Sequence, residues 1–170
     1  MKFDIIFFNF LNKIGPDYIF AFVADFSDWI FIGILAVFLF LNFRERLKIV
    51  SEALIAGVVA RFLLKELIIF FYSRTRPFEI LENVRQLIYH APGESFPSGH
   101  AIFFFALAVI IFIYNKRWGI IFLAMAFLMS FSRVVAGIHW PSDIIGGALL
   151  GIVTALLIHL LKRRFIKGTQ

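Results

Sequence analysis

Five long apolar segments constrain the fold of this 170-residue chain more than any other feature. They cover about residues 29–43 with a start near residue 18, then 49–72, 100–114, 118–135 and 144–161. A helix needs about 20 mostly apolar residues to cross a bilayer. Hydrophobic residues make up 61% of the chain and charged residues 16%, which leaves too few polar side chains to cover a soluble globule. The sequence therefore predicts an all-α integral membrane bundle of about five spanning helices.

The charges at the ends of these segments predict the orientation of the bundle. Basic residues fall between segments one and two, between three and four, and after five: Arg44, Arg46, Lys48, Lys116, Arg117, Lys162, Arg163, Arg164 and Lys167. In a five-span bundle these positions share one side, which the positive-inside rule makes the cytoplasm. The outer side then holds the N-terminus, the loop 73–98 and the junction around His139. We attribute the net charge of +6 to basic residues on the cytoplasmic side of a cell (inner) membrane, and we do not expect nucleic-acid binding.

The N-terminal stretch 3–11 is apolar but too short to span, so it predicts an interfacial helix. Asp4 stands where a signal peptide carries positive charge, and no small-residue cleavage site follows, so a signal peptide is not expected. The length fits a single membrane-embedded domain over 1–170. The chain has no Cys, which excludes disulfides, thiolate catalysis and Cys-ligated metals.

Three polar clusters lie on the predicted outer side, and the first follows the second apolar segment. It contains Arg74, Arg76 and Pro77. Proline ends the helix and favours an extended conformation for the residue before it. The planar guanidinium matches the geometry of phosphate, so the pair suits an anion. The alternative is a pair of arginines that only reach the membrane surface.

The second cluster, Pro97-Ser98-Gly99-His100, opens the third apolar segment. Ser98 is a natural N-cap, and Gly99 lets the backbone approach a ligand. Free N–H groups and the partial positive charge make a helix N-terminus suitable for an anion. Alternatively, His100 is an ordinary histidine at the membrane interface.

The third cluster contains Arg133, His139 and Asp143. His139 and Asp143 are four residues apart, so they share a face if the segment is helical. An aspartate that holds one ring nitrogen leaves the other free as nucleophile or base. The alternative is that Ser142 and Asp143 only cap the fifth segment, and both roles are compatible.

Together these clusters gather histidines, arginines and one aspartate at one membrane face. This set suits phosphoryl transfer through a phosphohistidine, in which one histidine attacks phosphorus and another protonates the leaving oxygen. Arginines and helix N–H groups would hold the developing charge. No carboxylate cluster is present for Mg²⁺, and two histidines with one aspartate at most suggest zinc, so no metal or other cofactor is predicted.

The pattern resembles the phosphatidic acid phosphatase type 2 superfamily of membrane phosphatases over roughly residues 45–160. The family's second motif reads Pro-Ser-Gly-His at 97–100. Its third motif is Ser-Arg, five residues, His, three residues and Asp, and it is matched from Ser132 to Asp143. The resemblance implies His139 as nucleophile, Asp143 as its orienting partner and His100 as general acid. It also implies phosphate binding by Arg76, Arg133, Ser98 and Gly99.

The first family motif, Lys, six residues and Arg-Pro, is incomplete because Ile69 stands where lysine is expected. Lys65 lies one helical turn earlier, and Arg74 lies two residues before Arg76. We expect Arg74 to be the better substitute, since it starts nearer the membrane surface.

The small size, amphipathic N-terminus and relaxed first motif resemble the bacitracin-resistance branch of the family. That resemblance implies an undecaprenyl (polyprenyl) diphosphate substrate, with membrane lipids as the other partners. A phosphatidylglycerophosphate, phosphatidate or lipid A phosphatase would carry the same motifs and stays an alternative. A different class of protein is also an alternative: a small channel or transporter, in which Arg61, Lys65 and Glu66 would line a pore. We favour an internal pairing of these three residues near the bundle axis that steadies the second segment, with Lys65 as the one that could also reach the site.

Overall fold

The computed structural model describes the backbone of residues 2–168 and the side chains of residues 2–165. The described residues form helices and no strand, which confirms the all-α prediction. The helices are α1 (Lys2–Leu11), α2 (Asp17–Leu41), α3 (Phe43–Val58), η1 (Val59–Leu64), α4 (Lys65–Phe71), α5 (Pro77–Ile80), α6 (Gly99–Tyr114), α7 (Lys116–Val135) and α8 (Pro141–Gly168). The segment η1 is a π-helical stretch that joins α3 to α4 in one continuous rod.

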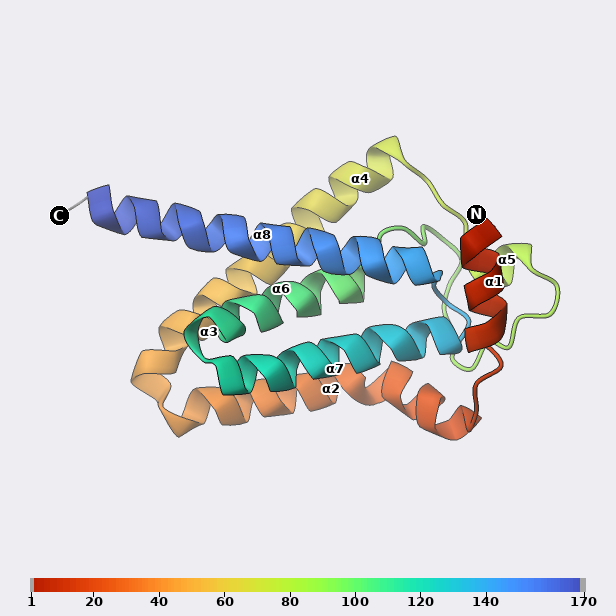
Figure 1. Ribbon diagram of the computed structural model, residues 1–170, viewed down its shortest axis with the longest axis horizontal. Helices are drawn as coiled ribbons and strands as arrows, with labels where there is room; N and C mark the ends of the chain where they lie inside the picture. Colours follow the sequence, from red (N-terminus) through yellow and green to blue (C-terminus); the bar gives the residue numbers. More distant parts are fainter. Residues whose placement is uncertain (1, 169–170) are drawn as a thin grey trace.

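Long rods follow the predicted apolar segments, and α1 lies across one end of the bundle (Figure 1). By length and composition, α2, α7 and residues 141–165 of α8 can cross a membrane. Helix α6 is shorter but equally apolar, and the rod α3–η1–α4 accounts for the second predicted segment. The predicted number of spans is therefore roughly confirmed.

Helix α6 is the centre of the bundle and packs against α3, α7 and α8. Its apolar side chains surround the helix on nearly every side, and Ala101, Ile102, Leu107 and Ile110 are fully buried or almost so. A helix that is apolar all round is stable only where other helices or lipid cover it. Helix α6 therefore forms the apolar core of the bundle, and its packing against α3, α7 and α8 holds these helices together.

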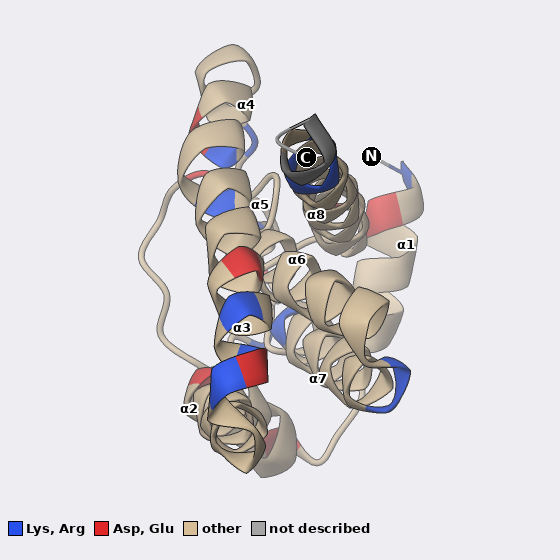
Figure 2. Cartoon of the chain, turned by 90° about the vertical axis from the view of Figure 1, so that its left-hand side faces the viewer, with Lys and Arg blue, Asp and Glu red and all other residues tan. Residues whose placement is uncertain are grey.

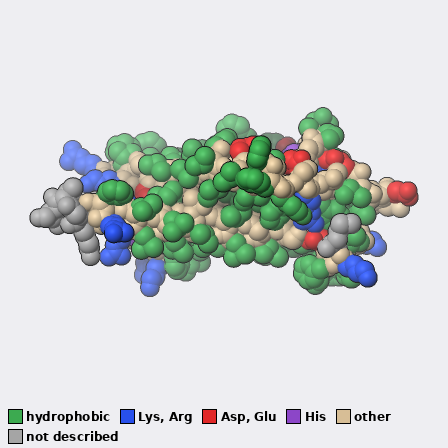
Figure 3. Space-filling model, turned by 90° about the horizontal axis from the view of Figure 1, so that it is seen from above, with side chains coloured by type: hydrophobic (Ala, Val, Ile, Leu, Met, Phe, Trp, Pro, Cys, Tyr) green, Lys and Arg blue, Asp and Glu red, His purple; other side chains and the backbone are tan. Residues whose placement is uncertain are grey.

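The outer surface of the bundle is also apolar. Figure 3 shows hydrophobic side chains along the length of the molecule, with Lys and Arg at the left-hand end and further charged side chains over the right-hand half. Trp29, Phe40 and Phe70 are largely exposed. A soluble monomer rarely exposes such a continuous apolar surface. The surface is therefore suited to the hydrocarbon of a bilayer.

The two ends of the bundle differ in their charges. The α2–α3 turn, the α6–α7 turn and the C-terminus share one end (Figure 1), and Figure 2 shows lysines and arginines on that end. These are the predicted cytoplasmic positions, although Lys167 lies outside the described side chains. Helices α1 and α5 and the α7–α8 junction share the other end, together with the polar clusters of the sequence.

Candidate active site

His139 lies in the short junction between α7 and α8, at the end of the bundle opposite the basic turns. Gly137 has a φ of +84°, a conformation that favours glycine, and a Cβ there would lie 2.8 Å from the Arg85 carbonyl oxygen. This turn brings the His139 Nδ1 atom to 3.4 Å from Asp143 Oδ2. His139 is 3% exposed and Asp143 is fully buried. The sequence-predicted histidine–aspartate pair is therefore brought together.

Burial lowers the pKa of His139 to about 4, although the hydrogen bond and charge of Asp143 oppose the shift. The ring is consequently neutral at neutral pH. A neutral imidazole that donates from Nδ1 to a carboxylate carries its lone pair on Nε2. His139 thus has the protonation state that a nucleophile needs.

The carboxylate of Asp143 is held on both oxygens. Oδ2 accepts hydrogen bonds from the backbone N–H of Trp140 at 2.8 Å and from the Ser95 hydroxyl. Oδ1 accepts from Arg74 Nη1 at 2.7 Å. A buried carboxylate needs such partners because its charge is poorly solvated. The network leaves Asp143 one orientation, toward His139.

Arg76 lies beside Nε2, the other ring nitrogen of His139. Its Nη1 atom is 3.4 Å from His139 Nε2 and donates to the Ile138 carbonyl oxygen at 2.9 Å. Its Nη2 atom donates to the Glu94 carbonyl oxygen at 2.9 Å. The extended residue Arg76 precedes Pro77, as the sequence predicts, and these carbonyls fix its guanidinium next to His139 Nε2. A phosphoryl oxygen near Nε2 would meet this cation.

Ser98 and Gly99 begin α6, the helix on which His100 stands in the first turn. Ser98 is buried, and among the described atoms its hydroxyl has no hydrogen-bond partner. A Cβ at Gly99 would lie 2.6 Å from Nη1 of Arg61, so only glycine allows that guanidinium so close to the helix N-terminus. Arg61 is thus a cation at the site that sequence reasoning did not assign to it.

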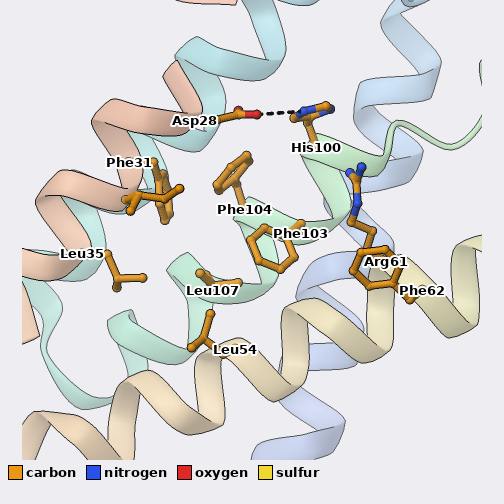
Figure 4. A pocket seen from close by; sticks show the side chains of 11 residues that line it. Asp28, Phe31, Leu35, Leu54, Arg61, Phe62, His100, Phe103, Phe104 and Leu107 are labelled. Carbon is orange, nitrogen blue, oxygen red and sulfur yellow. Dashed lines mark hydrogen bonds and ion pairs between the residues drawn. The ribbon is translucent and has the colours of Figure 1, made fainter. Parts of the chain in front are cut away.

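His100 has a carboxylate partner that sequence reasoning also missed. Asp28 of α2 places Oδ2 at 3.2 Å from His100 Nε2 and Oδ1 at 3.7 Å from Nη2 of Arg133. Figure 4 draws the Asp28–His100 contact, and Arg133 reaches the same carboxylate from α7. The only sequence signal was an aspartate within an apolar spanning segment, where charges are costly and usually functional.

A cavity of about 160 Å³ joins these residues. It is lined by Arg61, Lys65, Arg76, His90, Glu94, Pro97, Gly99, His100 and His139. Both predicted catalytic histidines and three cations therefore face one small polar space. Its size and charge suit a phosphate group.

The preference for Arg74 as the substitute for the missing family lysine is not supported by this geometry. Lys65 lines the cavity with the histidines, whereas Arg74 lines a separate cavity of about 600 Å³ with Asp4 and Ser142. Arg74 donates a hydrogen bond to Oδ1 of Asp143, the carboxylate oxygen that does not face His139. The loop after α4 turns the Arg74 side chain toward α1 and the start of α8. The expected internal pairing of Lys65 with Glu66 is a loose 3.8 Å contact, and the Glu66 side chain is 63% exposed.

An apolar groove of about 360 Å³ adjoins the polar cavity, and His100 and Arg61 line both. Phe31, Phe62 and Leu107 are among its apolar lining residues (Figure 4). The arrangement can accommodate a polar headgroup beside a hydrocarbon chain. Within the described residues, no three His, Cys, Asp or Glu side chains are grouped as metal ligands would be.

Comparisons with known proteins identify the family of the chain. A family model described as the PAP2 superfamily matches residues 49–167. The protein named "Bacitracin transport permease protein BcrC" of Bacillus licheniformis is 35% identical over 157 residues, which cover 89% of this chain and 76% of the relative. Undecaprenyl-diphosphatase BcrC of Bacillus subtilis is 32% identical over 126 residues, covering 73% of this chain and 63% of the relative.

The crystal structure of Aquifex aeolicus LpxE matches with a TM-score of 0.74 and 28% identity, covering 91% of this chain and 93% of that chain. The matched family region runs from α3 through most of α8 and contains the second and third sequence motifs in full. The chain therefore belongs to the PAP2 superfamily and is a multi-pass membrane lipid phosphatase.

Proposed function

We propose that this single-domain enzyme hydrolyses a polyprenyl diphosphate, undecaprenyl diphosphate, to the monophosphate at the extracytoplasmic face of the cell membrane. The observation that carries the proposal is the cavity lined by His139, His100 and three cations. A phosphate monoester carries about 1.5 to 2 negative charges, and a diphosphate carries more. Arg61, Lys65 and Arg76 suit the larger charge.

The proposed reaction starts with attack by His139 Nε2 on the terminal phosphorus. The bond from that phosphorus to the bridging oxygen breaks, and His100 donates a proton to this oxygen as the lipid monophosphate leaves. Water then attacks the phosphohistidine, His100 accepts a proton, and inorganic phosphate is released. Asp143 keeps the His139 ring oriented and stabilises its positive charge.

The residues around the reacting phosphate stabilise its charge. Arg76 lies beside the attacking nitrogen, and Gly99 in the first turn of α6 lines the same cavity, where the positive end of the helix dipole favours an anion. Arg133 acts from α7 through its contact with Asp28. Side chains and helix dipoles supply this stabilisation, so we propose that the reaction needs no metal and survives chelation by EDTA.

The neighbouring groove supports a lipid substrate. It continues from His100 and Arg61 between α2, α3 and α6, where Phe31, Leu54 and Phe103 form apolar walls. The Bacillus subtilis relative is named for undecaprenyl diphosphate, and it is longer than this chain. The basic residues at the opposite end of the bundle support the proposed extracytoplasmic location.

A substrate panel with the purified protein in detergent tests the proposal. Phosphate release is compared for undecaprenyl diphosphate, phosphatidylglycerophosphate, phosphatidate and lipid A, with His139→Ala as the inactive control. We expect the highest kcat/KM with the diphosphate. A higher value for one of the other lipids would overturn the substrate assignment, and equal release by His139→Ala would overturn the mechanism.

A further inference from the structure

We infer that Asp4 of α1 and Arg74 are positioning residues, which act through Asp143 to hold His139 in its reactive orientation. The inference rests on the roles proposed for His139 and Asp143. It assigns a catalytic purpose to the N-terminal helix, which lies outside the matched family region 49–167.

The guanidinium of Arg74 bridges two carboxylates. Its Nη1 atom donates to Asp143 Oδ1 at 2.7 Å and to the Ser142 hydroxyl at 2.6 Å. Its Nη2 atom donates to Asp4 Oδ2 at 2.9 Å. Charge-assisted bonds in a fixed fork restrict rotation of the carboxylate they hold. Since Oδ1 of Asp143 is bound in this way, Oδ2 stays directed at His139.

Asp4 completes the arrangement by contacting the start of α8. Its Oδ1 atom accepts a hydrogen bond from the backbone N–H of Ser142 at 3.0 Å, so it caps the N-terminus of α8 from a distant part of the chain. Asp4 is 6% exposed. Burial alone would raise its pKa, but the hydrogen bonds from Ser142 and Arg74 lower it. Asp4 therefore stays charged while buried against Arg74.

Helix α1 is fixed to the active-site end by one face. Asp4 and Phe8 of α1, and Asn12 in the turn directly after the helix, are spaced by four residues and are all buried. Phe8 lies against the Trp140 ring, with centroids 5.3 Å apart. The Asn12 Nδ2 atom donates to the Val135 carbonyl oxygen at 2.8 Å. The contacts of this face therefore involve the α7–α8 junction that carries His139.

The opposite face of α1 is mostly apolar, although Lys2 and Asn9 are also exposed there. Ile6 and Phe10 are 68% and 69% exposed, and Phe3 and Phe7 are also exposed. An interfacial helix usually turns its polar face to water. Here Asp4 and Asn12 turn inward instead, and the exposed face suits lipid. The inward polar residues are explained if their task is to hold the site.

A phosphate-binding role for Arg74 is disfavoured by where its side chain lies. The cavity beside Arg74 and the cavity between the histidines share no lining residue among the described side chains. Arg74 is also paired with carboxylates, which would repel a phosphate. Its charge instead compensates the buried Asp143, whose isolation would be costly.

The test compares Asp4→Asn with Asp17→Asn. Asp17 also pairs with an arginine, Arg85, at 2.7 Å, but its side chain is 54% exposed and contacts no proposed catalytic residue. With undecaprenyl diphosphate as substrate, we expect Asp4→Asn to lower kcat about threefold to tenfold and Arg74→Ala about tenfold to a hundredfold, with little change in KM. Asp17→Asn should keep wild-type kinetics.

Two further measurements separate positioning from phosphate binding and from stability. Inhibition by inorganic phosphate should be unchanged in Arg74→Ala and weaker in Arg76→Ala. Asp4→Asn should add little to the loss in an Arg74→Ala background, since Asp4 acts through Arg74. Thermal unfolding in detergent shows whether each variant is folded.

The inference is overturned if folded Asp4→Asn has wild-type kcat, if its effect is additive with Arg74→Ala, or if Arg74→Ala selectively weakens phosphate inhibition. Failure of the proposed function has a different signature, because wild-type protein would then not hydrolyse the diphosphate or His139→Ala would remain active.

Discussion

The carboxylate of Asp28 lies 3.2 Å from the imidazole of His100, measured from Oδ2 to Nε2. Asp28 belongs to α2, and its other oxygen is 3.7 Å from Arg133 Nη2 of α7. The pair therefore connects the proposed general acid on α6 to a helix that lies outside the matched family region. A carboxylate beside a histidine stabilises the protonated ring, which is the form that donates a proton.

We predict that Asp28→Asn lowers kcat about tenfold, because the protonated form of His100 loses its carboxylate partner. The loss should be larger for substrates with poor leaving groups than for those with good ones, since only the former need the proton. Asp25→Asn is the matched control, as Asp25 is exposed three residues earlier on α2. Equal losses for all leaving groups would contradict this role.

The pH dependence of the free enzyme follows from the buried state of His139. Its pKa is lowered to about 4, so the reactive neutral ring is lost only as the pH falls through that value. We predict that the acid limb of kcat/KM assigned to the enzyme lies near pH 4, rather than near the ordinary histidine value of about 6.5. The ionisation of the substrate, measured separately by ³¹P NMR titration, is factored out. An enzyme limb near 6.5 would show that His139 is not desolvated as described.

Lys65 is expected to take over the charge of the missing family lysine at Ile69. We predict that Lys65→Met lowers kcat/KM about tenfold to a hundredfold, the range expected for one charge-assisted hydrogen bond. The effect should be larger for a diphosphate than for a monophosphate lipid, because the diphosphate carries more charge. Glu66→Gln is the control, since the Glu66 side chain is 63% exposed. A near-neutral Lys65→Met would exclude this lysine from phosphate binding.

A polar cluster at the opposite end of the bundle is predicted to contribute stability without affecting chemistry. Buried Glu52 accepts hydrogen bonds from Tyr114 at 2.7 Å and Lys162 at 2.5 Å, and its Oε1 lies 2.8 Å from His159 Nδ1. Glu52→Gln should lower the free energy of unfolding by about 1–3 kcal/mol, seen as a lower Tm in detergent. Turnover by the folded variant should match wild type. Unchanged Tm, or lost turnover in folded protein, would contradict this separation.

Much of the fold was predictable because spanning helices depend on local sequence. Apolar length and basic turns predicted the rods from α2 to α8, and the position of Pro77 predicted the extended residue Arg76. The spacing of His139 and Asp143 also predicted their pairing, since the junction keeps them close even though His139 precedes α8.

The partners of the site were harder to predict because they come from distant parts of the chain. Asp4 and Asp28 lie at least 70 residues from the histidine and arginines they contact, and nothing in their own sequence neighbourhoods specifies those contacts. The contacts of Arg74 were not foreseen for a related reason. Its position near Arg76 suggested phosphate, but the direction of its side chain depends on how α1 packs against the α7–α8 junction.

The central claim is that His139 carries the phosphoryl group, and rapid acid-free quenching tests it most directly. Wild-type protein and His139→Ala are mixed with substrate labelled with ³²P in the terminal phosphate, and bound label is mapped by mass spectrometry after digestion. The account predicts a label on His139 that survives alkali and is lost in acid, with turnover by His139→Ala reduced on the order of 10⁴-fold or more. A label on another residue, or rapid turnover by His139→Ala, would contradict it.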